Sequence, residues 1–347
     1  MITTRSEALL SVRNLKVYFQ TKSERMFGGR KWLHAVDGIS FDIPRGKTFG
    51  IVGESGSGKS TAALAIMRLV PIMEGEIELA GSKLSESEGN ERMELRKRVQ
   101  IIFQDPYSSL NPRMRAGAIV REPLDLMNVG DRDQRSERVA DLFQKVGLRI
   151  EHQALFPHQF SGGQRQRIGV ARALASQPDL IVCDEPVSAL DVAIQAQILN
   201  LLSNLQEEFK LTYLLISHDL GVVQHVCDDI GVMYLGEIVE KADRISLFKR
   251  PLHPYTWALL SAVPSIDKRT SESRHRVRLK GDPPSPIDLP RGCRFAGRCP
   301  FVQNICHEQS PVHRQIFPNH WVSCHLVSDD GIPPHETDNY ADQRTAL

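Results

Sequence analysis

Short apolar runs alternate with longer segments of mixed polarity along most of the chain. Runs such as 180–183 and 212–216 have the length and composition of strands buried on both faces. Elsewhere apolar residues recur at helical spacing, as Val139, Leu142 and Val146 do. The pattern predicts strands at 9–19, 36–43, 48–52, 75–79, 99–103, 180–183, 212–216, 230–235 and 238–239, a polar loop at 81–90, and helical segments at 61–69, 117–176 and 194–209. Because strands and helices alternate, we expect an α/β fold around a largely parallel sheet.

The pattern changes after about residue 251. Prolines then recur often enough to break any long helix or strand, at positions 251, 254, 264, 283, 284, 286 and 290. We therefore expect a first domain over residues 1–250 and a smaller one over residues 251–327. The last segment, 328–347, is polar and is expected to be disordered.

The composition is that of a globular protein, and we expect it to act in the cytoplasm. Of the 347 residues, 41% are hydrophobic, and 43 basic against 42 acidic residues give a net charge of +1. This balance lacks the basic surplus typical of nucleic-acid binding. The first residues do not resemble a signal peptide, and no run reaches the ~18 apolar residues that span a bilayer. If the protein acts at a membrane, we expect it to dock on another protein that spans it.

The most informative motif is a glycine-rich loop between a predicted strand and a predicted helix. It matches the phosphate-binding pattern G-x-x-x-x-G-K-[ST] and consists of Gly53, Glu54, Ser55, Gly56, Ser57, Gly58, Lys59 and Ser60, followed by Thr61. The glycines let successive backbone N–H groups face an anion at a helix N-terminus. Lys59 can reach the β- and γ-phosphates of a nucleotide, and the Ser60 hydroxyl can ligate Mg²⁺. The motif predicts a nucleoside triphosphate site.

Further polar side chains follow other predicted strands. Asp184 and Glu185, His218, and Gln104 each come at the end of an apolar run. Asp184 can hold Mg²⁺, and Glu185 is placed to polarise an attacking water. We expect His218 to contact the γ-phosphate and Gln104 to bind Mg²⁺ and water. Together with Lys59, these residues predict phosphoryl transfer to water.

A second anion site is predicted where another helix begins. Ser161, Gly162, Gly163 and Gln164 open this helix, and a serine with two glycines at a helix N-terminus can bind phosphate. One chain needs one cradle for a γ-phosphate, so a second site indicates that two chains enclose nucleotide between them. Asp191 is expected at the interface between them.

These motifs occur in the order found in ATP-binding-cassette (ABC) ATPases, which the chain resembles over residues 9–250. The segments QDPYSSLNP (104–112), PHQFSGGQRQRI (157–168), HPYT (253–256) and GCRFAGRCP (292–300) resemble the dipeptide/oligopeptide importer subfamily, and this resemblance reaches residue 326. It implies an ABC-type P-loop nucleotide-binding domain with a RecA-like core, an antiparallel β subdomain, a helical subdomain over about 105–176 and a small cysteine-rich C-terminal appendage.

The resemblance also implies a function and partners. It implies an ATP-hydrolysing subunit, using ATP and Mg²⁺, that powers uptake of dipeptides, oligopeptides or a related solute. The implied partners are two transmembrane permease subunits, a second ATPase subunit that is often a different chain and, indirectly, an extracytoplasmic solute-binding protein, but no nucleic acid. Such a subunit lies on the cytoplasmic face of the cell membrane.

Two departures from the family pattern concern aromatic residues. The signature begins with Phe160 where the family at large has leucine, and residues 21–34 separate the usual adenine-stacking aromatic from the P-loop. By position, Phe19 is the first choice to stack on adenine and Tyr18 the second. The alternative for Phe19 is an apolar core position.

Four of the six cysteines lie close together in the sequence, at Cys293, Cys299, Cys306 and Cys324. In a reducing compartment this grouping indicates a metal or a cluster rather than disulfides. The spacing lacks C-x2-C, so a zinc ribbon fits poorly, whereas wide spacing on loops suits a [4Fe–4S] cluster. The resembling importer subunits favour the cluster as well. Zinc and unliganded thiols remain the alternatives.

A second class of function is a soluble cassette ATPase that acts on DNA. Such proteins usually carry long coiled coils or zinc modules between the P-loop and the signature helix. Here the gap between Lys59 and Ser161 is short and contains no heptad repeat, which favours a transport cassette. A small-molecule kinase, the third alternative, leaves the Ser161 helix unexplained.

Overall fold

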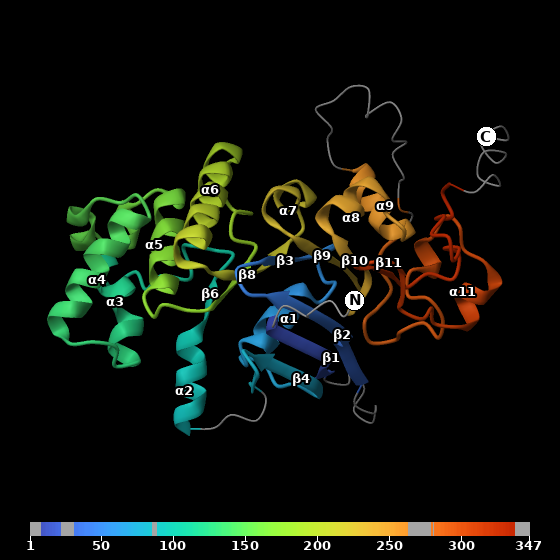
Figure 1. Cartoon of the computed structure of the whole chain (residues 1–347), viewed down its shortest axis with the longest axis horizontal. Coiled ribbons are helices and arrows are strands. Elements are labelled where there is room, and N and C mark those ends of the chain that lie inside the picture. The colour runs from blue at the N-terminus through green and yellow to red at the C-terminus, as the bar shows by residue number, and fades with distance from the viewer. Residues whose placement is uncertain (1–7, 22–30, 85–88, 263–278, 280, 337–347) are drawn as a thin grey trace, which may run out of the picture.

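The computed structural model describes residues 8–21, 31–84, 89–262, 279 and 281–336. Two sheets with helices packed around them form the protein (Figure 1). None of the helices in these ranges is both long and apolar enough to cross a membrane.

The elements follow the alternation expected from the sequence. The strands are β1 (Ala8–Thr21), β2 (Lys31–Pro44), β3 (Thr48–Val52), β4 (Glu74–Leu79), β5 (Ser82–Lys83), β6 (Val99–Ile102), β7 (Leu180–Asp184), β8 (Thr212–Ser217), β9 (Asp229–Tyr234), β10 (Glu237–Asp243), β11 (Arg314–Phe317) and β12 (His320–Val322). The α-helices are α1 (Lys59–Ile66), α2 (Gly89–Arg98), α3 (Ala116–Leu126), α4 (Arg132–Lys145), α5 (Gly162–Leu174), α6 (Val192–Phe209), α7 (Leu220–Val226), α8 (Arg244–Lys249), α9 (Pro254–Ser261) and α11 (Asn304–Glu308). The 3₁₀ helices are η1 (Ile150–Ala154), η2 (Pro157–Gln159) and η3 (Ala296–Arg298).

The larger sheet has the strand order β11-β12-β10-β9-β3-β8-β7-β6. Neighbours from β9 through β3, β8 and β7 to β6 are parallel, and the pairs at the other end are antiparallel. The smaller sheet, in the order β2-β1-β4-β5, is antiparallel. The predicted α/β class is therefore confirmed, although its sheet is mixed rather than parallel throughout.

The central strands divide the core into two layers. In β7, Leu180 and Val182 belong to a hydrophobic cluster shared with α1 and the smaller sheet, whereas Ile181 and Cys183 belong to a cluster shared with α3–α7. Successive side chains of a strand point to opposite faces, so both faces of β7 are buried. This explains why the strand appears in the sequence as a continuous apolar run.

Three expectations from the sequence differ from the structure. The main sheet gains β11 and β12, which the sequence pattern misses because both strands are short and carry polar residues. The loop expected at 81–90 contains β5 and the start of α2. Residues 328–336, expected to be disordered, instead pack on the protein, where the His335 ring stacks on Trp257 at 4.5 Å. The remainder of that tail lies outside the described residues.

The larger sheet also crosses the boundary expected near residue 250. Glu240 of β10 is fully buried and accepts hydrogen bonds from the backbone N–H groups of Leu252 (2.7 Å) and His253 (2.9 Å). Its third partner is the Nε2 of His320 in β12, at 2.7 Å. These contacts tie the C-terminal region to the edge of the sheet.

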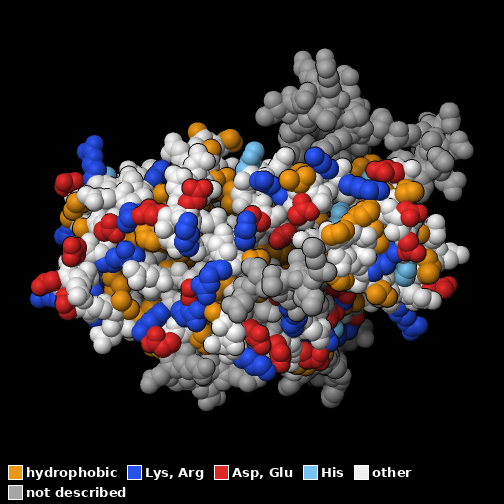
Figure 2. All heavy atoms as spheres, viewed as in Figure 1, with side chains coloured by type: hydrophobic (Ala, Val, Ile, Leu, Met, Phe, Trp, Pro, Cys, Tyr) orange, Lys and Arg blue, Asp and Glu red, His pale blue; other side chains and the backbone are white. Residues whose placement is uncertain are grey.

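Acidic and basic side chains are interspersed on the face shown in Figure 2. This distribution agrees with the nearly balanced composition of 43 basic and 42 acidic residues. The visible face offers no broad area of a single charge.

Candidate active site

The predicted site residues meet at one edge of the larger sheet. Strands β3, β8, β7 and β6 are parallel neighbours, so their carboxyl ends lie along a common edge. The glycine-rich loop follows β3, His218 follows β8, Glu185 follows β7 and Gln104 comes just after β6. Ligands of α/β sheets bind outside this edge.

The glycine-rich loop folds around the ammonium group of Lys59. Its Nζ donates to the backbone oxygens of Gly53 and Glu54, both at 2.8 Å, and the residue is only 4% exposed. Burial lowers the pKa of Lys59, and the carboxylates of Glu185, Asp184 and Glu54 oppose that shift. The lysine is thus held within the loop by weak backbone partners that an anionic phosphate can replace.

Gly58 is a position in this loop that admits no side chain. Its φ of +105° lies in a region that favours glycine, and a Cβ there would stand 2.0 Å from the backbone oxygen of Ala35. The residue also serves as the N-cap of α1. Glycine therefore allows the backbone to approach the smaller sheet just where the phosphate cradle turns into the helix.

Ser60 and Asp184 form a pair of oxygen donors beside Lys59. The Ser60 Oγ donates to Asp184 Oδ1 at 3.0 Å. Burial raises the pKa of Asp184 and the neighbouring Glu185 carboxylate adds to the rise, whereas the Ser60 hydroxyl and the Lys59 ammonium group oppose it. A hydroxyl and a carboxylate are hard oxygen ligands of the kind that Mg²⁺ prefers. The donor set therefore fits a magnesium ion.

The carboxylate of Glu185 is held by two side chains from neighbouring strand ends. Gln104 Nε2 donates to Glu185 Oε2 at 2.8 Å, and His218 Nδ1 lies 3.1 Å from the same oxygen. Because a carboxylate oxygen accepts, Nδ1 of the imidazole carries the proton in this contact. Within the described part of the chain, the other oxygen, Oε1, makes no hydrogen bond, so it can accept one from a water.

The backbone of Glu185 adopts an uncommon conformation. Its φ is +46°, in the left-handed region, and its N–H donates to the oxygen of Ile216 in β8 at 3.0 Å. Ser188 donates from its Oγ to the Glu185 oxygen at 3.1 Å. Strained backbone of this kind is concentrated at functional sites, where the surrounding structure maintains it.

The residues of the second predicted anion site lie where helices α5 and α6 begin. Ser161 caps α5, with its Oγ accepting from Gln164 N (3.3 Å) and its N–H donating to Gln164 Oε1 (3.0 Å). Asp191 caps α6 by accepting from the N–H of Ile194 at 3.0 Å. A Cβ on Gly163 would stand 2.6 Å from Ile194 Cγ2, so the two helix starts pack closely. The structure thus brings Ser161, Gly163 and Asp191 together where α5 and α6 begin.

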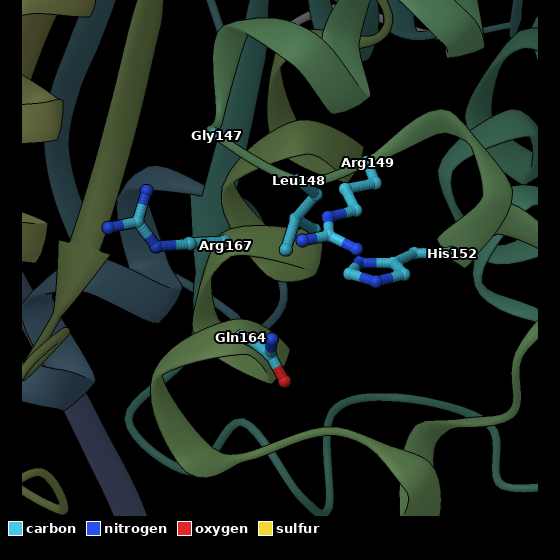
Figure 3. Close-up of a pocket in the computed structure, with 6 residues that line it drawn as sticks. All are labelled: Gly147, Leu148, Arg149, His152, Gln164 and Arg167. Carbon is cyan, nitrogen blue, oxygen red and sulfur yellow. The ribbon is translucent and has the colours of Figure 1, made fainter.

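A pocket of about 480 Å³ opens beside α5 (Figure 3). Its lining includes Gln164 together with the cationic or titratable side chains of Arg149, His152 and Arg167. Figure 3 shows the side chains of Arg149 and His152 next to each other, with Gln164 below them. No residue of the glycine-rich loop lines this pocket.

The two candidate adenine-stacking residues are placed differently. Tyr18 donates a hydrogen bond to Asp37, and its ring lies 4.2 Å from that of His34. Phe19 is half-buried and packs against the apolar cluster below the smaller sheet. Phe19 therefore stays the predicted stacking residue, with the core position as its alternative.

Two C-terminal residues contact the glycine-rich loop, and the sequence motifs did not assign them to it. The Tyr255 hydroxyl accepts a hydrogen bond from the N–H of Glu54, and Arg298 pairs with the Glu54 carboxylate. Both lie in segments that resemble the importer subfamily, which was the only available signal. They are more than 200 positions from Glu54 in the sequence.

The fold and this arrangement of side chains define a P-loop nucleoside triphosphatase. Comparison with known families gives two matches, the ABC transporter family over residues 36–188 and the oligopeptide/dipeptide transporter C-terminal region over residues 239–306. The chain is 50% identical to the oligopeptide transport ATP-binding protein AppF of Bacillus subtilis, covering 94% of this chain and all of that protein. It is 44% identical to the di/tripeptide transport ATP-binding protein DppF of Pseudomonas aeruginosa, covering 92% and 98%.

Solved structures agree with this assignment. The ATP-binding cassette MJ0796, in a dimeric post-hydrolysis state with ADP and phosphate, matches with a TM-score of 0.60 and 28% identity over 68% of this chain and 98% of that one. The chain belongs to the family of oligopeptide and dipeptide ABC transporter ATP-binding proteins. It is an ATPase with the cassette fold, and nothing in the comparisons supports the DNA-acting alternative.

The prediction of an iron–sulfur cluster is wrong. The four C-terminal cysteines are free thiols, and the described residues contain no group of three or more His, Cys, Asp or Glu side chains that could hold a metal. The names of the relatives describe ATP binding and peptide transport and mention no such cluster.

Proposed function

We propose that this chain hydrolyses ATP to power the import of oligopeptides or dipeptides. The observation that carries the proposal is the Gln104–Glu185–His218 cluster at the end of the P-loop sheet, in a chain that matches peptide-transport ATP-binding proteins over almost its whole length. The match of residues 239–306 to the C-terminal region of oligopeptide/dipeptide transporters supports the peptide cargo.

The proposed assembly contains two membrane-spanning permease subunits, a second ATPase subunit and, outside the membrane, a solute-binding protein. The subunit lies on the cytoplasmic face of the membrane, residues 1–250 act as the ATPase domain, and residues 251–327 form the C-terminal domain. The relatives' names, which describe peptide-transport ATP-binding proteins, support a role in a transporter, and the dimeric state of the matching cassette supports the second ATPase subunit. Loop residues after Gln104, which include the exposed Tyr107, are the proposed contact with a permease.

In the proposed mechanism, Lys59 and the backbone N–H groups of the loop bind the β- and γ-phosphates of ATP. Glu185 Oε1 accepts a proton from the attacking water, while Gln104 and His218 hold the carboxylate through Oε2. This geometry orients the base before reaction and leaves one oxygen available to the water. Negative charge that develops on the phosphoryl oxygens is stabilised by Lys59 and the helix N-terminus of α1.

The Ser60 and Asp184 oxygens, with Gln104, would hold Mg²⁺, which neutralises phosphate charge when it is bound. The Ser161–Gln164 helix start of one subunit would face the γ-phosphate held by its partner subunit, with Asp191 at the contact. This proposal gives the second predicted anion site a role at the contact between the two subunits.

Substitution Glu185→Gln tests the proposed base. We expect ATP binding to persist and hydrolysis to fall by at least ~10²-fold, because the amide cannot accept the proton. Phosphate release and binding of a fluorescent ATP analogue measure the two properties. Glu207→Gln, on the exposed side of α6, is the matched control and should behave as the native protein does. Native hydrolysis by Glu185→Gln would refute the assignment.

A transport assay tests the cargo. Vesicles that contain the complete transporter should take up a labelled tripeptide only when ATP is present on the side of this subunit, and unlabelled di- and tripeptides should compete. Uptake that peptides do not inhibit would refute peptide import while leaving the ATPase assignment in place.

A further inference from the structure

One residue of the glycine-rich loop is held from the C-terminal region at two points. The N–H of Glu54 donates to the hydroxyl of Tyr255 in α9 at 2.8 Å. The guanidinium of Arg298, in the cysteine-containing segment, donates to both carboxylate oxygens of Glu54, at 2.7 and 3.0 Å. Backbone and side chain of one P-loop residue are thus both fixed by residues that follow the predicted ATPase domain.

Both contacts stand in a well-packed environment. Tyr255 is fully buried, with its ring 4.7 Å from that of Tyr234 and 5.4 Å from that of Phe295. The Arg298 side chain is 8% exposed and lies over the Tyr234 ring, while the Glu54 side chain is 30% exposed. A bidentate arginine–carboxylate pair with a buried arginine is stronger than an exposed ion pair, because little water screens it.

A second arginine fixes the same segment to the ATPase domain. Arg294 pairs with Glu237 at 2.8 Å and also contacts Asp37 and the backbone oxygen of Leu235. Asp37 is the residue to which Tyr18 donates. The segment that carries Arg298 is therefore anchored to β2 and to the turn after β9, independently of the contact with Glu54.

Glu54 also connects this segment with the phosphate-binding lysine. Its backbone oxygen accepts a hydrogen bond from Lys59 Nζ at 2.8 Å. Its carboxylate belongs to a loop that must receive a strongly anionic triphosphate, and a free carboxylate there would repel the substrate. The guanidinium of Arg298 cancels this charge, and the Tyr255 hydroxyl holds the adjoining peptide.

We propose that Arg298 and Tyr255 are positioning residues of the ATP site, through which the C-terminal region sets the affinity of the P-loop for nucleotide. The inference rests on the proposed binding of ATP by Lys59 and this loop. It assigns a function to the C-terminal region inside the ATPase reaction.

Substitution Arg298→Met in the full-length chain gives the first test. We expect the Kd for a fluorescent ATP analogue to rise about tenfold, equivalent to about 1.4 kcal/mol, while Arg298→Lys gives a smaller increase. In hydrolysis, KM should rise and kcat should change little, because the lost interaction supports binding of substrate and transition state alike. Arg291→Met is the control, since Arg291 is exposed and no hydrogen bond or ion pair joins its side chain to the described residues. A Kd for Arg298→Met within twofold of the native value would overturn the proposal.

A second substitution in Glu54 separates this role from general stabilisation. If Arg298 acts by cancelling the Glu54 charge, then Glu54→Gln combined with Arg298→Met should restore the Kd to within about twofold or threefold of the native protein, because no carboxylate is left unpaired. If Arg298→Met weakens binding only by disturbing the structure, the Kd of the double variant should be as high as that of Arg298→Met or higher. A double variant that binds no better than Arg298→Met alone would overturn the proposal.

Tyr255→Phe keeps the test decisive if the arginine variants fold poorly. It removes one hydroxyl and retains the buried ring, so the melting temperature should change little while the Kd rises about threefold. An unchanged Kd in this folded variant would overturn the role of Tyr255. Lys59→Ala identifies the source of a failure. If it loses nucleotide binding while Arg298→Met does not, only this inference fails, whereas native binding by Lys59→Ala refutes the proposed ATP site itself.

Discussion

The start of helix α5 allows a quantitative test, because two glycines in one helix stand in contrasting surroundings. A Cβ on Gly163 would lie 2.6 Å from Ile194 Cγ2, whereas a Cβ on Gly169 would meet no atom within 4 Å. Both substitutions to alanine make the same chemical change in the same helix. The difference between the unfolding free energies of the two variants therefore measures mainly how α5 packs against α6.

The expected magnitudes follow from two opposing effects. Replacing a helical glycine by alanine stabilises a helix by up to about 1 kcal/mol, since the unfolded chain loses conformational freedom. Gly169→Ala should realise this gain. At Gly163 the added methyl group forces the β-branched Ile194 side chain to move, and overpacking of this kind costs about 1–3 kcal/mol. Gly163→Ala should thus be less stable than Gly169→Ala by roughly 1–3 kcal/mol.

Urea unfolding followed by circular dichroism measures the free energies of unfolding of Gly163→Ala and Gly169→Ala. The rate of ATP hydrolysis shows whether the change also disturbs the function of the helix start at Ser161. The substitution Gly163→Ala should become neutral or stabilising in an Ile194→Ala background, because the clash is then removed. Equal stability of Gly163→Ala and Gly169→Ala in the native background would show that the two helix starts are not in close contact, and would refute the reasoning.

Three further results are expected. Burial lowers the pKa of His253 to about 4, below its unfolded value of about 6.5. As the pH falls, the unfolded state therefore takes up the proton before the folded state does. The free energy of unfolding should decrease below pH 6.5, by up to about 3 kcal/mol near pH 4. His253→Asn, which keeps an acceptor for the N–H of Tyr255, should weaken this dependence in urea titrations at several pH values. Asp191→Ala removes the N-cap of α6 and should lower the unfolding free energy by about 1 kcal/mol, and an unchanged value would contradict the cap. Chelation of Mg²⁺ should stop ATP hydrolysis, and Ser60→Ala should raise the Mg²⁺ concentration needed for half-maximal activity, whereas an unaltered requirement would exclude Ser60 as a ligand.

Much of the catalytic edge could be predicted from the sequence because its residues follow apolar strands. Asp184, Glu185 and His218 each come where a buried run ends, and parallel strands bring such ends together. The glycine-rich loop can be recognised from the fixed spacing of its glycines, lysine and serine. The sequence does not reveal which strands are neighbours in the sheet. That order brings Gln104 and His218 into contact with the same carboxylate oxygen of Glu185.

The C-terminal region was harder to predict, for physical reasons. β11 and β12 are short strands with polar residues that pair with each other, and the pairing of β12 with β10 joins distant parts of the chain. The cysteine spacing indicated a ligand set, but spacing does not determine whether thiols converge or how deeply they are buried. The contacts of Tyr255 and Arg298 with Glu54 are also long-range, and no local pattern encodes them.

The burial of Glu240 limits how this protein can be shortened or recombined. All three of its hydrogen-bond donors come from beyond residue 250, so a chain cut there would keep a carboxylate in an apolar interior with none of them. The same cut would uncover the hydrogen-bonding edge of β10, which invites association with other chains. Chimeras that exchange C-terminal regions between related subunits should therefore be joined before β10 rather than after it.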